Sequence, residues 1–207
     1  MVYADRTAAG HVLGLSLDNL QAVHPLVLGL PRGGVAVAAA VQAVIGGQLD
    51  ILLVRKVGVP RQPELAVGAV GEGGVRVVNP DVMRYAGISS PQLTAIEARE
   101  LTELHRRRHV LRGSADPIPL AGRTVVIVDD GMATGATVVV ACRVARLHQP
   151  DRVVVAVPVS STEAMRRVAP EADAVICPWV PRSLHGVGGA YRDFHQLTDA
   201  EVLALLS

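Results

Sequence analysis

The stretch that decides the fold is Val125-Val126-Ile127-Val128-Asp129-Asp130-Gly131-Met132-Ala133-Thr134-Gly135-Ala136-Thr137. Its first four residues are apolar and β-branched, which predicts a strand buried on both faces. Two carboxylates follow, then a tight turn of small residues and hydroxyls, and then a helical run from Val138 to Leu147. Because ligands of an open parallel sheet bind beyond the carboxyl ends of its strands, this turn is a candidate binding site.

The chemistry of the turn suits a sugar phosphate. A turn of small residues that opens a helix aims backbone N–H groups and the positive end of the helix dipole at one point, which suits a phosphate. Thr134 and Thr137 can add hydroxyl donors. Asp129 and Asp130 repel a phosphate, but they can accept hydrogen bonds from neighbouring hydroxyls such as those of a sugar. One phosphate beside one diol describes a 5-phosphoribosyl group.

The stretch resembles the phosphoribosyl-diphosphate (PRPP) signature of type I phosphoribosyltransferases. In that signature a hydrophobic strand is followed by two acidic residues, two variable residues and then Ala/Asp/Thr-Thr-Gly-x-Thr, and all the fixed positions are present. The alternatives are a Walker-B-like strand or a phosphate-binding turn of another α/β protein, but the chain has no G-x-x-x-x-G-K-[ST] sequence and so lacks the main partner of a P-loop. The resemblance implies that Asp129 and Asp130 hold the ribose hydroxyls. It also implies that the 5-phosphate is bound by Gly131, Met132, Ala133, Thr134, Gly135, Ala136 and Thr137.

A second turn, Leu30-Pro31-Arg32-Gly33-Gly34, follows a short apolar run. Its two glycines let the backbone approach a ligand closely, and Arg32 adds a bidentate cation. In the resembled family the matching loop grips the diphosphate of PRPP, so Pro31, Arg32, Gly33 and Gly34 are predicted to bind that group. The alternative interpretation is an ordinary strand-to-helix turn with a surface arginine.

Arg55 and Lys56 directly follow the apolar run 51–54, which we interpret as a buried strand. Two cations at the carboxyl end of a strand are costly to bury unless they meet an anion. The run 54–61 is similar to the corresponding strand end of adenine-type and xanthine-type phosphoribosyltransferases, where the Arg-Lys pair faces the diphosphate. The resemblance therefore adds Arg55 and Lys56 to the predicted diphosphate site, with a solvated strand end as the alternative.

The order of strand and helix patterns predicts an α/β fold. A strand, a helix and a second strand between residues 26 and 54 predict a right-handed parallel crossover, and the resemblance implies a parallel doubly wound sheet with a small hood. Runs 66–70 and 75–78 around a Gly-rich turn predict an antiparallel hairpin. We expect one domain over residues 1–207, with its core at about 22–177 and its hood and flexible parts at 58–122 and 178–207.

A long helical pattern from Pro91 to Leu111 is an addition to the family's usual connection. Acidic residues early in this helix and the basic run His105–His109 late in it suit the helix dipole. We interpret the basic run as a solvated helix end, with an RNA or diphosphate contact as the alternative.

Composition excludes several functional classes. The net charge of +1 over 207 residues argues against a broad nucleic-acid-binding face, so nucleic acid is an unlikely partner. Cys142 and Cys177 lie far apart in apolar runs, which indicates buried thiols in a reducing compartment. The histidines lack zinc spacing.

The start of the chain lacks the pattern of a signal peptide, and no apolar run reaches membrane-spanning length. We expect a cytoplasmic protein without membrane contact.

The resemblance implies transfer of 5-phosphoribosyl from PRPP to a nitrogenous base with release of diphosphate. Asp129, Asp130, Arg32 and Lys56 are the predicted catalytic residues, and Mg²⁺ is expected to arrive with PRPP, with Asp129 and Asp130 as possible ligands. Trp179, the single tryptophan, could stack on the acceptor base or could fill an apolar gap. The resemblance also favours a homodimer.

Two other functions are compatible with these sequence features. One is a PRPP-binding or nucleotide-binding regulatory module without transferase activity. The other is a hydrolase or phosphorylase that acts on a phosphoribosyl compound. The 6-oxopurine enzymes usually carry an aspartate directly before the Thr-Gly of the signature. This chain has Ala133 there, as in adenine-type enzymes, which disfavours hypoxanthine or guanine chemistry with that aspartate as the base.

Overall fold

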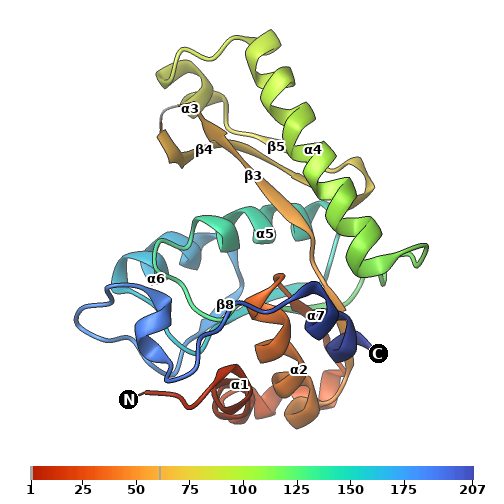
Figure 1. Cartoon of the computed structure of the whole chain (residues 1–207), viewed down its shortest axis with the longest axis vertical. Helices are drawn as coiled ribbons and strands as arrows, with labels where there is room; N and C mark the ends of the chain where they lie inside the picture. The colour runs from red at the N-terminus through yellow and green to blue at the C-terminus, as the bar shows by residue number, and fades with distance from the viewer. Residues whose placement is uncertain (1, 61) are drawn as a thin grey trace.

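A five-stranded parallel sheet forms the centre of the computed structural model, which describes residues 2–60 and 62–207 (Figure 1). The strand order is β2-β1-β6-β7-β8. The strands are β1 (Leu26–Gly29), β2 (Gln48–Ile51), β6 (Thr124–Val128), β7 (Arg152–Ala156) and β8 (Ala174–Ile176). The chain winds outward in one direction from β1 and in the other from β6, so the sheet has its topological switch point between these two neighbours. The predicted parallel α/β fold is confirmed.

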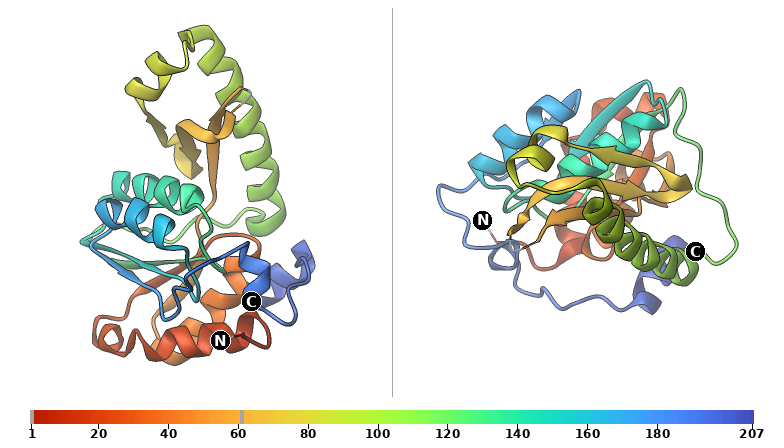
Figure 2. Two further views of the ribbon diagram at one scale, coloured as in Figure 1. Left: turned by 90° about the vertical axis from the view of Figure 1, so that its left-hand side faces the viewer. Right: turned by 90° about the horizontal axis from the view of Figure 1, so that it is seen from above.

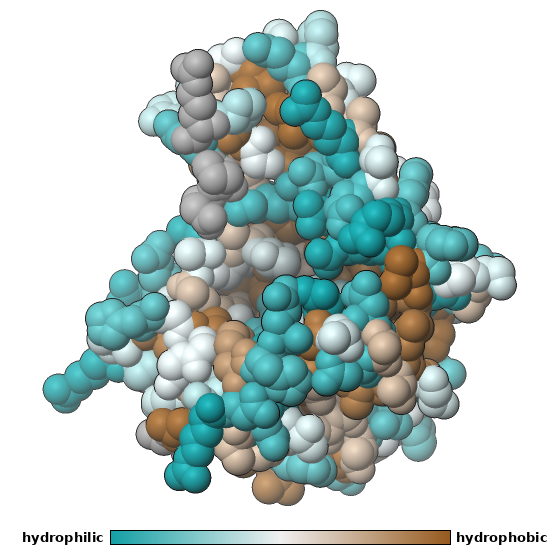
Figure 3. Space-filling view, viewed as in Figure 1, coloured by the Kyte–Doolittle hydropathy of each residue, from teal (hydrophilic) through white to brown (hydrophobic). Residues whose placement is uncertain are grey.

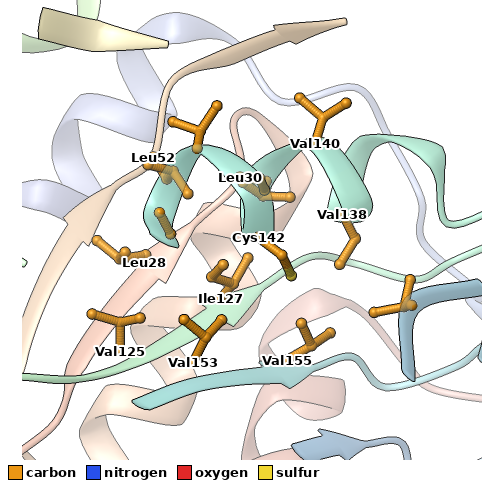
Figure 4. Packing of buried hydrophobic residues seen from close by; sticks show 14 of the residues in the cluster. Leu28, Leu30, Leu52, Val125, Ile127, Val138, Val140, Cys142, Val153 and Val155 are labelled. Atoms are coloured by element: carbon orange, nitrogen blue, oxygen red, sulfur yellow. The ribbon is translucent and has the colours of Figure 1, made fainter. Parts of the chain in front are cut away.

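Helices cover both faces of this sheet. On one face lie α1 (Arg6–Leu15), the short 3₁₀ helix η1 (Asp18–Val23) and α2 (Gly33–Ile45), packed on alternate residues of β1, β6 and β7. On the other face lie α5 (Ala136–Leu147) and α6 (Thr162–Val168), and Figure 4 shows side chains of α5 above those of the strands. Because both faces are covered, the β-branched run 125–128 is fully buried, as its sequence predicts.

A second, antiparallel sheet carries residues 54–78 away from the core (Figures 1 and 2). It contains β3 (Val54–Val59), β4 (Gln62–Gly71) and β5 (Arg76–Val78), with the turn η2 (Glu72–Gly74) between the last two. The helices α3 (Pro80–Tyr85) and α4 (Ser90–Arg112) pack on this sheet. We call residues 54–112 the arm; the space-filling view shows it standing above the body of the molecule (Figure 3). Gly68 pairs with Val78 and Val70 with Arg76, which confirms the predicted hairpin.

The prediction of one buried strand over residues 51–54 is wrong. Ile51 ends β2 of the parallel sheet, and Val54 starts β3 of the arm. Leu52 packs in the core cluster beneath α5, whereas Leu53 packs with residues of α2 and of the C-terminal helix. Two linker residues buried in different clusters make the apolar run continuous, and this continuity hides the point at which the chain leaves the sheet.

The N-terminal segment at Tyr3 pairs with the segment that follows η4 (Val187–Ala190) near the C-terminus. Tyr3 forms a parallel bridge with Tyr191, and Tyr3 N donates a hydrogen bond of 2.8 Å to Ala190 O. The C-terminal segment includes η4 and leads to α7 (Asp199–Leu206), which begins with a Thr198 capping box. No helix in the described part of the chain is long and apolar enough to cross a membrane.

Candidate functional site

Two loops meet at the switch point of the parallel sheet, one after β1 and one after β6. Leu30 N donates to Val128 O at 2.9 Å, which fixes the start of the first loop against the end of β6. A Cβ on Gly33 would lie 2.0 Å from Asp130 Oδ2, and a Cβ on Gly34 would lie 2.6 Å from Val128 O. The two glycines are therefore required by the close approach of this loop to the acidic doublet. The Pro31–Arg32 peptide bond between the strand and these glycines is cis.

The signature loop after β6 forms an anion-type hollow. Gly135 has φ +71° and is the N-cap of α5, where it offers no side chain to the first turn of the helix. A hollow of about 100 Å³ is lined by Asp129 and by residues 131–138. Thr134 and Thr137 are exposed there, so their hydroxyls can donate to one small anion at the start of α5. The first N–H of the helix, that of Ala136, donates to Thr134 Oγ1 at 3.4 Å.

The acidic doublet lies at the opposite end of the same loop. Asp130 N donates to Asp129 Oδ1 at 2.9 Å, and the hydroxyl of Tyr191 donates to Asp130 O at 2.5 Å. Burial, and then the neighbouring charge of Asp130, raise the pKa of Asp129 well above its usual value. Burial also raises the pKa of Asp130, although hydrogen bonds from Arg6 oppose the shift. In the ligand-free protein, charge on this doublet is therefore only partly compensated.

Arg6 is the residue at this site that our sequence analysis missed. Its Nε and Nη2 both lie 2.9 Å from Asp130 Oδ2, and its Nη1 donates to His195 O at 2.8 Å. Its guanidinium carbon lies 4.0 Å from the centre of the Phe194 ring. An arginine in the first turn of a surface helix resembles a solvated one, and no spacing links it to a carboxylate 124 positions away.

His195 ties the same C-terminal segment to α7. Its imidazole nitrogens lie 2.9 Å from Asp193 Oδ1 and 3.2 Å from Glu201 Oε1. The hydrogen bond with Asp193 and then that with Glu201 raise the pKa of His195.

The three predicted cations do not all lie at the two loops. Arg32 points toward α7, with its Nη1 3.8 Å from Asp199 Oδ1. Arg55 and Lys56 lie within β3 of the arm, so their predicted position at the end of a parallel strand is wrong. Nε and Nη2 of Arg55 each lie 2.8 Å from Glu100 Oε2 on α4. Their contribution to a diphosphate site stays a prediction.

Trp179 lies after β8, beside the signature loop. Its ring is half-buried and makes an edge contact with Tyr3 at 6.1 Å between centroids. It lines a hollow of about 440 Å³ together with Leu184 and His185. The adjoining Val187 packs on the signature loop so closely that a Cβ on Gly131 would lie 2.6 Å from it.

Comparison with known proteins identifies the family. A model of the phosphoribosyl transferase domain matches residues 8–185, which is most of the chain. The chain belongs to this family. It is 49% identical over 205 residues to two proteins of Mycobacterium tuberculosis, strains CDC 1551 and H37Rv, each named a "putative phosphoribosyl transferase". These matches cover 99% of the chain but 46% of each relative, so the chain spans about half the length of the curated relatives it matches.

A solved structure has the same fold over its whole length. The protein TT1426 from Thermus thermophilus is 45% identical, with a TM-score of 0.93 over 100% of this chain and 98% of that one. The arm and the C-terminal segment of this phosphoribosyl transferase domain are therefore shared with TT1426.

The basic run on α4 is paired within the molecule. Arg106 and Arg107 both donate to Glu103, at 2.8 Å and 3.1 Å, and Arg108 lies 3.5 Å from Asp116. Arg106 and Arg107 also line a hollow with Arg32, so the solvated helix end and the diphosphate contact both stay predictions. Among the described residues, no group of three or more His, Cys, Asp or Glu side chains could hold a metal ion.

Proposed function

We propose that this chain transfers the 5-phosphoribosyl group of PRPP to a nitrogenous base or a similar nitrogen nucleophile and releases diphosphate. One observation carries the proposal. A single loop holds an anion-type hollow at the start of α5 and an acidic doublet at its other end, and the doublet is wedged against the Gly33-Gly34 turn. A phosphate, a diol and a diphosphate need these three environments side by side.

The residues of the loop would act by positioning and by electrostatics. The hollow at residues 131–137 anchors the 5-phosphate, and this fixes C1 of the ribose relative to the nucleophile. Asp129 and Asp130 accept hydrogen bonds from the ribose hydroxyls. As the bond from C1 to the diphosphate oxygen breaks and the bond to the nitrogen forms, positive charge grows on the ribose, and the two carboxylates stabilise it.

The departing diphosphate takes the electron pair of the broken bond. In our proposal it lies against the backbone N–H groups of Gly33 and Gly34, with Arg32 and Lys56 as cations. Mg²⁺ fits this scheme, because it favours substrate oxygens and water over an all-protein cage. When bound with PRPP, the ion would neutralise negative charge on the diphosphate.

The acceptor would enter on the side of Trp179. The hollow beside this ring adjoins the signature loop through Val187 and is large enough for a nucleobase. Ala133 offers no carboxylate to a base, so we propose recognition by stacking on Trp179. We also propose a homodimer, which sedimentation velocity would test.

The test is diphosphate release from PRPP and Mg²⁺ with a panel of purine and pyrimidine bases. Release that depends on one base supports a transferase, whereas release without any base indicates a hydrolase. Binding of PRPP without release indicates the regulatory module. Calorimetry with Asp130→Asn should show PRPP binding strongly weakened. The matched control is Asp81→Asn, which removes a carboxylate that is 83% exposed on the arm. Equal binding of PRPP by wild type and Asp130→Asn would count against the proposal.

A further inference from the structure

Arg6 is held in place by contacts on three sides. Its side chain is 9% exposed, its guanidinium stacks on Phe194, and its Nη1 donates to the backbone of His195. The Arg6 guanidinium is largely desolvated and contacts an aromatic ring, a carbonyl and a carboxylate. Another rotamer of this side chain would lose all three contacts. These contacts involve residues on both sides of the segment 8–185 that matches the family model.

The contact of Arg6 with Asp130 uses one defined carboxylate oxygen. Nε and Nη2 both reach Oδ2, and the hydroxyl of Tyr191 holds the backbone carbonyl of the same residue. Asp130 is therefore fixed through its side chain and through its backbone, which leaves Oδ1 as the oxygen without a contact to Arg6. A hypothetical Cβ on Gly33 would lie 3.0 Å from Arg6 Nε, so Arg6 lies directly behind the Gly33-Gly34 turn.

We infer that Arg6 is a positioning residue, which fixes Asp130 so that Oδ1 accepts a hydrogen bond from a ribose hydroxyl. This inference rests on the proposed function. It assigns Arg6 to the sugar end of the ligand and not to the diphosphate, because the guanidinium donates to Asp130 Oδ2 and to His195 O and stacks on Phe194. Through Arg6, the C-terminal residues 191–195 become part of the support of the acidic doublet.

Two probes separate this role from a direct contact with the diphosphate. Ribose 5-phosphate carries the sugar and the 5-phosphate alone, whereas PRPP with Mg²⁺ carries the diphosphate as well. We expect calorimetry with Arg6→Met to show both ligands weakened by the same factor, about 10-fold to 100-fold, the range for a hydrogen bond to a charged group. Weakening of PRPP alone would overturn the inference, since it would place Arg6 on the diphosphate.

A double-mutant cycle separates positioning from general loss of structure. If Arg6 acts through Asp130, then Arg6→Met should weaken ribose 5-phosphate little when Asp130→Asn is already present. Factors that multiply would mean that the two residues act independently and would overturn the inference. Arg6→Lys retains the charge with a single donor group, so it should recover part of the affinity.

Melting temperatures of all variants show whether each is folded. If Arg6→Met does not fold, Phe194→Leu serves instead, because it removes the ring over the guanidinium and leaves every charge in place. It should weaken the binding of ribose 5-phosphate in the intact site, and not at all beside Asp130→Asn. Wild-type protein that binds neither ligand would refute the proposed function and the inference with it. Wild-type binding with independent factors would overturn the inference alone.

Discussion

Arg112 lies at the base of the arm in a buried ion network, and its removal gives the sharpest test of how the arm is attached. Its side chain is 6% exposed, and those of its partners Asp50 and Glu72 are 9% and 8% exposed. Nη1 lies 2.7 Å from Asp50 Oδ1, Nε lies 3.0 Å from Glu72 Oε1, and Nη2 donates to Ile51 O at 2.8 Å. Burial alone would lower the pKa of Arg112, but the hydrogen bonds to the two carboxylates outweigh it and raise the pKa.

Arg112→Met leaves two buried carboxylates without their shared cation. Breaking a buried pair in this way costs about 3–5 kcal/mol. Asp50 keeps the N–H donors of Ile51 at 2.7 Å and Ile118 at 2.9 Å, and Glu72 keeps Arg108 at 3.6 Å. We therefore expect the lower end of the range, about 3 kcal/mol, which corresponds to a fall in melting temperature of about 6–12 °C for a chain of this size.

Thermal and urea unfolding of wild type, Arg112→Met and Arg84→Met measure this cost. Arg84→Met breaks an ion pair with Asp81 whose side chains are 77% and 83% exposed, so its midpoint should match that of wild type. Adding Glu72→Gln to Arg112→Met should restore part of the lost stability, because it removes one uncompensated charge. Equal midpoints for Arg112→Met and Arg84→Met, or a further loss of stability when Glu72→Gln is added to Arg112→Met, would show that the buried network does not hold the arm in this way.

Three further predictions concern the two loops and the C-terminal segment. Gly33→Ala places a Cβ 2.0 Å from Asp130 Oδ2, so calorimetry should show PRPP binding weakened at least about tenfold. The control is Gly189→Ala, whose Cβ meets nothing within 4 Å and which should bind PRPP as wild type does. Because the pKa of Asp129 is raised in the folded protein, its ionisation costs stability once the pH rises above the ordinary pKa of an aspartate. Asp129→Asn should therefore melt at a higher temperature than wild type at neutral pH, and it should bind PRPP weakly. The raised pKa of His195 gives stability that is complete below pH 6.5 and is lost as the pH rises through the folded-state pKa. The difference in melting temperature between wild type and His195→Gln should therefore shrink as the pH rises, and a constant difference would contradict this origin.

The parallel core and its two loops could be predicted because their signals are local. Continuous β-branched residues such as 125–128 have one common explanation, a strand covered on both faces. Gly33 and Gly34, in the turn that follows an apolar run, indicate a close backbone approach, and in the structure Gly33 lies against Asp130 with no room for a Cβ. In each case the residues that carry the signal are the residues that make the contact.

The exit of the chain from the parallel sheet into the arm and the support of the acidic doublet could not be predicted, because their contacts join distant positions. The exit from the parallel sheet at Leu52 is hidden, since the linker is as buried as the strands that it joins. Arg112 looks like a cation that complements the dipole at the end of α4, yet it is buried by residues 40 and 62 positions away. A helical pattern predicts which face of a helix is polar, but it does not predict which carboxylate will contact that face.

The two carboxylates of the doublet, adjacent in sequence, have been given different environments. Asp130 has a fixed cation in Arg6, whereas Asp129 Oδ1 has the backbone N–H of Asp130 as a donor and lies beside a like charge. Charge on Asp129 is therefore disfavoured until hydrogen-bond donors or positive charge arrive from outside the chain. If the chain is a transferase, a ribose hydroxyl and the positive charge that grows on the ribose supply both, and the free energy that the folded protein loses at Asp129 is recovered during the reaction. At Asp130, burial also raises the pKa, but the hydrogen bonds from Arg6 oppose that rise, so the two neighbouring carboxylates are not left equally uncompensated.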